Sequence, residues 1–172
     1  FGAALTNTVE ASTISGYDNT GNNTSVVEAT AYPLSTIAAA RAGSNGQVFA
    51  VEGQVIYTPG TFNSSGWALQ DATGGIAAFY SPPPAVNRDD TVRLVATRSS
   101  YSNEEQFGAP VSYFENLGAG SAVDPSPYTT GAVAAGSTEG WLVEVEGAIA
   151  GLTCPTGFNY SFTVDDGSGP AI

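Results

Sequence analysis

The sequence predicts a mostly β protein built from two small five-stranded barrels in tandem, the second incomplete within the chain, after an extended N-terminal arm. Three observations lead to this fold class. One is an internal repeat, another is a series of short alternating strands separated by Gly- and Pro-rich turns, and the third is a polar first stretch of the chain. We therefore expect an arm at 1–30, a first barrel at 31–120 and an incomplete second barrel at 121–172.

The repeat has two matched stretches. Residues 47–55 (QVFAVEGQV) match 141–149 (WLVEVEGAI) at an offset of 94 positions, and 67–75 match 162–169 at an offset of 95. The first copy continues through two further strand-like segments, whereas the second stops soon after its second match. A sheet that lacks strands has unpaired edge groups, so we expect a segment outside this module to complete it.

The arm combines polar spacing with short β-prone stretches around Leu5, Val9 and Ile14. Two interpretations stay open: a flexible leader, or an arm that adds to another sheet. In the segment after the arm, Ser35 or Thr36 can cap a short helix that ends at Gly43. The segments below are then expected as strands, and five short strands after one helical turn favour a closed barrel over a sandwich. In the first copy they are 48–57, 67–71, 76–80, 91–97 and 111–117, and in the second, after a helical turn at 131–136, they are 141–149 and 160–165.

Charge bounds the range of partners. Sixteen acidic residues stand against four arginines, with no lysine or histidine, for a net charge of -12. Nucleic acid binding draws its affinity from cationic contacts to phosphate, so this balance argues against it. Arg88, Arg93 and Arg98 lie close in sequence, but alternation sends the last two to opposite faces of a strand. We expect them to pair with nearby acids, namely Asp89, Asp90, Glu104 and Glu105.

Composition also sets expectations for compartment and anchoring. No apolar run approaches the length of a membrane-spanning helix, so no membrane span is expected. The chain begins at Phe1 and is rich in Gly, Ser, Thr and Asn, from which we expect a processed protein, extracellular or at the cell surface. Its single cysteine, Cys154, is expected to be a free or buried thiol. Four Asn-x-Ser/Thr sequons provide candidate glycosylation sites at Asn22, Asn23, Asn63 and Asn159.

Few residues offer catalytic chemistry. Without histidine, Ser-His nucleophiles and the usual metal sites cannot be built, so we expect no enzyme activity and no cofactor. The strongest metal candidate is calcium at Asp165 and Asp166, although the spacing is not that of a full calcium loop. Aromatic side chains are expected mainly in the core. Tyr101, with Asn103 in a Ser-rich loop, is the candidate for surface contact with a ligand.

A family resemblance adds to this interpretation. A short Ala-rich helix precedes the strand motif at 51–55, the Gln-Asp-x-Thr-Gly-Gly-Ile turn within 67–76 and the Asp-Thr-Val-Arg-Leu strand at 90–94. This pattern resembles the OB-fold modules of secreted bacterial nucleases and phosphoesterases, over 31–120 and partly over 121–172. The family usually has Gly where this chain has Asp89 and Ala96. The resemblance implies an OB-like fold that serves as an accessory module beside a separate catalytic domain.

Two functions follow from these expectations. The first is a non-catalytic exported structural protein, in which the arm of one copy completes the second barrel of a neighbour and so builds a homopolymeric filament or surface array. The alternative is an accessory binding or spacer module of a longer secreted nuclease or phosphoesterase. Binding of single-stranded nucleic acid or polysaccharide follows from the fold alone, and the net charge argues against nucleic acid.

Overall fold

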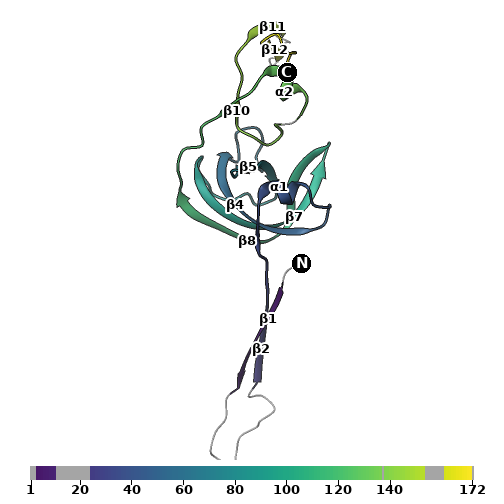
Figure 1. Cartoon of the computed structure of the whole chain (residues 1–172). Helices are drawn as coiled ribbons and strands as arrows, with labels where there is room; N and C mark the ends of the chain where they lie inside the picture. The colour runs from purple at the N-terminus through teal and green to yellow at the C-terminus, as the bar shows by residue number, and fades with distance from the viewer. Residues whose placement is uncertain (1–2, 11–23, 137, 154–160, 172) are drawn as a thin grey trace, which may run out of the picture. The chain divides into compact units, whose positions relative to one another are not determined.

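The computed structural model describes residues 3–10, 24–136, 138–153 and 161–171, with only the backbone described at 3–10 and 24–29 (Figure 1). The chain divides into two compact units, Phe1–Pro33 and Leu34–Ile172. Within the described residues, no helix has the length and apolar character needed to cross a membrane.

The first unit is a β-hairpin. Strand β1 (Ala3–Glu10) pairs antiparallel with β2 (Thr24–Ala31). Two of the residues expected in the arm lie in β1, where Leu5 pairs with Ala29 and Val9 with Ser25, while Ile14 lies outside the described residues. The stretches around Leu5 and Val9 therefore form one strand, β1, whose partner is β2 of the same chain.

The second unit begins with a closed barrel of five strands. The short strand β3 (Leu34–Ser35) and helix α1 (Ile37–Arg41) precede it. Its strands are β4 (Val48–Tyr57), β5 (Gly66–Gln70), β6 (Gly75–Phe79), β7 (Asp90–Tyr101) and β8 (Glu104–Ala119). They follow the order β4-β5-β6-β8-β7, and pairing of β7 with β4 closes the barrel (Figure 1). Helix α1 starts at the predicted cap, because the Thr36 side chain accepts a hydrogen bond from the Ala39 N–H.

Strands β7 and β8 are longer than predicted. The expected Ser-rich loop is instead part of a ladder that runs, with register shifts, from Asp90↔Ala119 to Tyr101↔Glu104. Only Ser102 and Asn103 turn the chain, both with positive φ. The prediction of a loop around Tyr101 is therefore wrong. Polar residues in this part of the hairpin resemble a loop in the sequence, yet cross-strand pairing keeps them in strands.

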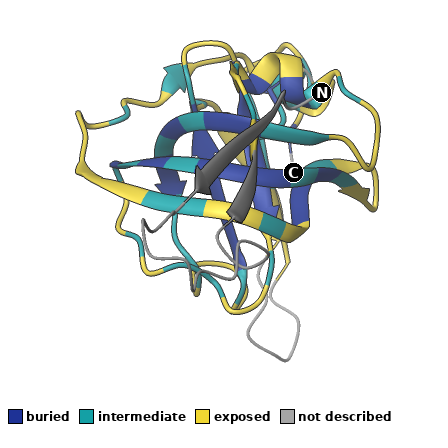
Figure 2. Cartoon of the chain, turned by 90° about the horizontal axis from the view of Figure 1, so that it is seen from below, coloured by how far each residue is buried: buried dark blue, intermediate teal, exposed yellow. Residues whose placement is uncertain are grey.

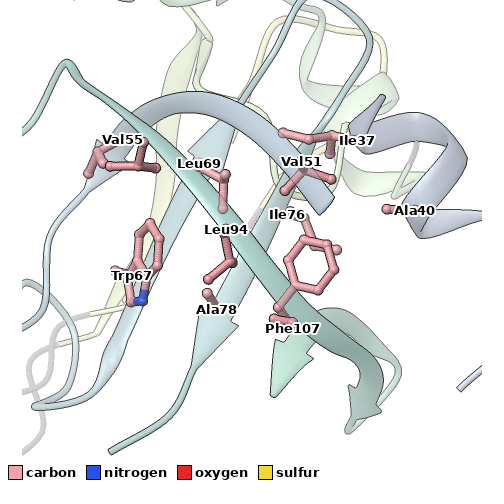
Figure 3. Close-up of a cluster of buried hydrophobic side chains, with 12 residues drawn as sticks. Ile37, Ala40, Val51, Val55, Trp67, Leu69, Ile76, Ala78, Leu94 and Phe107 are labelled. Atoms are coloured by element: carbon pink, nitrogen blue, oxygen red, sulfur yellow. The ribbon is translucent and has the colours of Figure 1, made fainter. Parts of the chain in front are cut away.

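The core fills the inside of this barrel. Buried positions gather on β4, β5, β6 and β7, whereas most loops and much of β8 are exposed (Figure 2). Inward-facing side chains of several strands point toward one another, with Trp67, Leu94 and Phe107 fully buried (Figure 3). Ile37 and Ala40 of α1 belong to the same cluster. The predicted core role of aromatic residues holds for Trp67, whose ring makes edge-to-face contacts with two others of the barrel.

Asp89 adopts a backbone conformation that favours glycine. Its φ is 70°, in the left-handed region. Aspartate is among the residues that tolerate this region best. Its N–H donates to the Val55 carbonyl, and its Oδ1 accepts from the Val123 N–H at 3.0 Å. Hydrogen bonds to residues distant in sequence therefore hold Asp89 in this conformation.

After the barrel the chain forms a second set of elements. These are β9 (Ser126–Pro127), α2 (Thr130–Ala134), β10 (Val143–Glu144), β11 (Ala148–Thr153) and β12 (Ser161–Asp165). The strand predicted over 141–149 is thus divided into β10 and the start of β11. In the first copy β7 pairs with β4 from Val48 to Gln54 and keeps it continuous. No strand among the described residues pairs with the second copy in this way.

Candidate functional site

A carboxylate links the turn after β5 to helix α1. Asp71 Oδ2 accepts a hydrogen bond from the Ile37 N–H at 2.8 Å, at the first residue of the helix. Asp71 Oδ1 accepts from the Thr73 N–H at 2.7 Å and from the Gly74 N–H at 3.0 Å. The Thr73 hydroxyl in turn accepts from the Ala38 N–H at 3.1 Å. The Asp-x-Thr-Gly motif therefore satisfies free donors at the helix N-terminus.

The second half repeats the main hydrogen bonds of this arrangement. Asp166 Oδ2 accepts from the Thr130 N–H at 3.2 Å, and Oδ1 accepts from the Ser168 N–H at 2.8 Å. The Ser168 hydroxyl accepts from the Gly131 N–H at 2.9 Å. Hydrogen bonds from Ser168, then from Thr130, hold the pKa of the Asp166 carboxyl well below its usual range. Thr129 caps α2 as Thr36 caps α1.

Strand register continues the correspondence. Gln54↔Gln70 in the barrel matches Ala148↔Asp165 in the second half. The pair Leu69↔Ile76 matches the isolated bridge Val164↔Ala171. Gly53 and Gly147 are also equivalent. A Cβ added at Gly53 would lie 2.9 Å from the Gln70 carbonyl oxygen, and one at Gly147 would lie 2.6 Å from the Asp165 oxygen. These pairings of described residues thus follow the offset of the sequence repeat.

The two copies differ in how far their equivalent residues are buried. Val55 and Trp67 are fully buried in the barrel, whereas their sequence counterparts Ile149 and Phe162 are 66% and 45% exposed. Leu152 is 65% exposed as well. Two residues whose counterparts lie in the core of the first copy, Ile149 and Phe162, are therefore exposed in the second, and Leu152 adds a third exposed apolar side chain. We call these three residues, Ile149, Leu152 and Phe162, the open face.

A short segment of the second half, 138–142, docks on the barrel beside β5 and β6. The Leu142 N–H donates to Gln70 Oε1 at 2.8 Å. Where the backbones cross, two glycines meet, and a Cβ added at Gly75 would lie 1.7 Å from the Gly140 carbonyl oxygen. Gly140 itself has a φ of 80°. Only glycine permits this approach at both positions.

Charged side chains reinforce this docking. The Glu139 carboxylate forms an ion pair with Arg41 at 3.0 Å and accepts a hydrogen bond from the Glu105 N–H at 2.9 Å. Arg41 also donates to the Gly75 carbonyl at 3.1 Å. The Glu105 carboxylate pairs with Arg98, whose side chain is 9% exposed. These side chains are partly shielded from water, so removing one partner would leave the other charge poorly solvated.

A groove of about 600 Å³ lies next to the docked segment. One wall comes from the loop that follows β4, where the rings of Tyr57 and Phe62 meet edge to face at 5.1 Å. Trp141 and Leu142 of the docked segment line it too, as does Glu104 at the start of β8. Burial, then the Glu104 charge, raises the pKa of Tyr57. The groove is therefore largely aromatic, and its lining includes one carboxylate, that of Glu104.

Sequence analysis identified little of this groove. Tyr101 is 71% exposed and Asn103 lies in the turn beside Glu104, yet neither lines the groove among the described residues. Asn63, named as a glycosylation candidate, does line it, and its side-chain oxygen accepts from the Ser65 N–H at 3.0 Å. Only the last two residues of the docked segment, 141 and 142, fall within a predicted strand. The close approach of Gly75 and Gly140 that docks the segment joins residues distant in sequence, so no local pattern predicts it.

The other predicted site residues have local roles or lie outside the description. Asp165 Oδ1 accepts from the Gly167 N–H at 2.8 Å, so both calcium candidates, Asp165 and Asp166, hold turn backbone. In the described ranges, no group of three or more His, Cys, Asp or Glu side chains could hold a metal ion. Outside the described residues lie the remaining candidates, Asn22, Asn23, Cys154 and Asn159.

The predicted pairing of arginines with acids is confirmed in part. Arg98 pairs with Glu105, and Arg88 lies 3.8 Å from Asp89. Arg93 pairs instead across the sheet with Glu52 at 2.8 Å and Glu115 at 3.6 Å. The ladder places these two acids directly opposite Arg93 on the neighbouring strands. A shared cationic patch is therefore not formed.

The strand order, the closure of β7 on β4 and the single helical turn define an OB-like barrel. Two solved structures resemble about half of this chain. The hypothetical protein YgiW from E. coli is 15% identical, with 49% of this chain and 90% of that chain covered, at a TM-score of 0.42. The OB domain (residues 67-166) of MM0293 from Methanosarcina mazei is 22% identical, with 49% and 83% covered, at a TM-score of 0.41. No family model and no curated protein matches the chain.

Proposed function

We propose that this chain is a non-catalytic accessory part of a longer secreted protein, in which two OB-like modules in tandem bind a ligand or space other domains. On this proposal the second half is the beginning of another OB-like barrel, completed by strands that follow in the same polypeptide. The resemblance of the first barrel to modules of secreted nucleases and phosphoesterases suggests the class of the whole protein. On this proposal the chain binds a ligand or spaces domains, and catalysis belongs to another part of the whole protein.

One observation carries the proposal. The bridge between Val164 and Ala171 has the register that Leu69 and Ile76 have in the barrel, where Ile76 belongs to the third strand, β6. This register supports the proposal, because a third strand of a second module would begin with the same pairing. Further strands along this path would cover the open face. Fully burying one Ile, Leu or Phe side chain contributes about 1.5–3 kcal/mol, so covering the face favours the complete barrel.

A second candidate function is self-assembly. It is favoured by the exposure of Ile149, Leu152 and Phe162, because an apolar face next to unpaired strand edges can also be covered by another copy. The donor would be the hairpin of β1 and β2, which adds through an outer edge, since its two strands pair with each other. Head-to-tail addition of this kind builds filaments of an extracellular structural protein.

The mass of the intact secreted protein separates the two candidates. The chain itself has a mass of 17.4 kDa. An antibody raised against it is used to isolate the protein from the culture of its source, and mass spectrometry gives the intact mass. A species well above that mass supports the accessory role. A mature species of the same mass as the chain refutes it and leaves self-assembly. Deleting 1–30 then tests whether the hairpin links one copy to the next. Polymers that still form after the deletion would exclude the hairpin as the linking segment.

A further inference from the structure

The groove beside the docked segment has the side chains of a binding site for a small organic ligand. Three aromatic residues line it, namely Tyr57, Phe62 and Trp141, and they come from two parts of the chain that only docking brings together. Phe62 is 79% exposed. An exposed aromatic ring next to a second ring in a concave surface offers a hydrophobic face to a ligand.

The charge of the groove narrows the ligand class. Each of the four arginines forms an ion pair, and the acids they contact are Glu139, Asp89, Glu52, Glu115 and Glu105. Glu104, the carboxylate of the groove, is absent from the ion pairs of the described residues, and it is exposed. The chain as a whole carries a net charge of -12. This field attracts cations and repels phosphate or sulfate groups.

Aromatic faces and a carboxylate together recognise a particular kind of cation. The negative face of an aromatic ring attracts an ammonium group, and rings arranged around such a group bind quaternary ammonium ligands. A trimethylammonium group makes no demand for hydrogen-bond acceptors, so rings and one carboxylate suffice to hold it. A neutral sugar would use the same rings for stacking but would gain nothing from the charge of Glu104.

We propose that the groove formed by Tyr57, Phe62, Trp141 and Glu104 binds an alkylammonium group of the trimethylammonium type. This inference deepens the proposed accessory role by giving the module a ligand. The ligand inference and the proposed accessory role can fail independently. The groove is formed entirely by residues of this chain, so its ligand does not depend on the length of the intact protein. A free choline molecule and a phosphocholine headgroup share this chemistry. They differ in the phosphate, which Glu104 and the negative field repel.

The two tryptophans allow a direct test. Trp141 lines the groove and Trp67 is fully buried in the barrel, so their indole N–H signals in a ¹H–¹⁵N NMR spectrum report the site and an internal control. Trp141→Phe assigns the signals. The 172-residue chain is titrated with choline chloride, with phosphocholine, with sodium chloride at matched ionic strength, and with the neutral disaccharide cellobiose.

We expect choline to move the Trp141 signal and not that of Trp67, with phosphocholine weaker and sodium chloride and cellobiose without effect. Phe62→Ala should weaken choline binding about two- to fivefold, the size of one exposed cation–π contact. Glu104→Gln should weaken it several-fold, whereas Glu146→Gln, which removes the same charge at an exposed position outside the groove, should not. The ¹H–¹⁵N spectrum of each of these three variants is compared with that of the parent chain, and spectra that overlay outside the groove show that folding is intact.

Several outcomes would overturn the inference. Equal shifts with sodium chloride would reduce the effect to ionic strength. A response to cellobiose without one to choline would assign the groove to neutral sugars. Unchanged choline binding in Glu104→Gln would remove the carboxylate from the site, and with it the argument for a cation.

Discussion

Truncating one equivalent position in each module tests the difference between the two copies. Val55→Ala removes two methyl groups from a fully buried side chain. At about 0.8 kcal/mol for each buried carbon, with an added cost for the cavity, this change should lower the free energy of unfolding by about 2 kcal/mol. Ile149→Ala removes three carbons, but this residue is 66% exposed. Only about a third of their transfer free energy is at stake, so the loss should be about 0.8 kcal/mol.

Urea unfolding followed by circular dichroism measures both losses, at two protein concentrations that differ about a hundredfold. The account predicts that Ile149→Ala stays the milder change in this chain at both concentrations. In the intact longer protein the same substitution should cost about 2–5 kcal/mol, as expected for a core isoleucine. A large loss in the 172-residue chain at low concentration would show that the open face is already covered. A loss that grows with concentration would instead support self-assembly.

Three further predictions concern docking, titration and the repeated turn. Gly75→Ala should release the docked segment and speed hydrogen exchange of the Leu142 amide. Gly74→Ala should not, since its added Cβ meets nothing closer than 3.5 Å. Equal exchange in both variants would refute the close approach of Gly75 and Gly140. Burial raises the pKa of Tyr80 from 10.0 to about 12, so its contribution to stability is complete below pH 10 and is lost as the pH rises toward 12. Thermal melts of Tyr80→Phe should lack this part of the alkaline loss, and an unchanged profile would exclude Tyr80 as its cause. The lowered pKa of Asp166 makes its contribution to stability present above the ordinary value of 3.8 and lost as the pH falls below it. The protection of the amides at the start of α2, relative to their intrinsic exchange rate at the same pH, should therefore fall in acid. Asp166→Asn should lower this protection at neutral pH, and full protection in that variant would show that the carboxylate is dispensable.

Local sequence was sufficient for much of the first barrel. Alternation over 48–57 gave the bounds of β4, and Thr36 before an Ala-rich stretch gave the start of α1. The turn at 71–75 was also identified. The sequence does not reveal that the Asp71 carboxylate reaches the Ile37 N–H, because this contact joins residues 34 positions apart.

Predictions failed where pairing with a distant strand decides the conformation. Residues 98–110 resemble a loop, yet pairing between β7 and β8 extends through them. Residues 141–149 resemble β4, yet they divide into two strands where no counterpart of β7 pairs with them among the described residues. The groove depends on Gly140 meeting Gly75, a long-range approach that no local pattern encodes. Sequence patterns thus located most strands of the first barrel, but not the contacts between residues distant in sequence.

The intact mass of the secreted protein tests the central claim most directly. The account holds that the second module is completed by strands later in the same polypeptide, so it predicts a mature protein well above 17.4 kDa. A mature protein of that mass which forms regular filaments in negative-stain electron micrographs would contradict it.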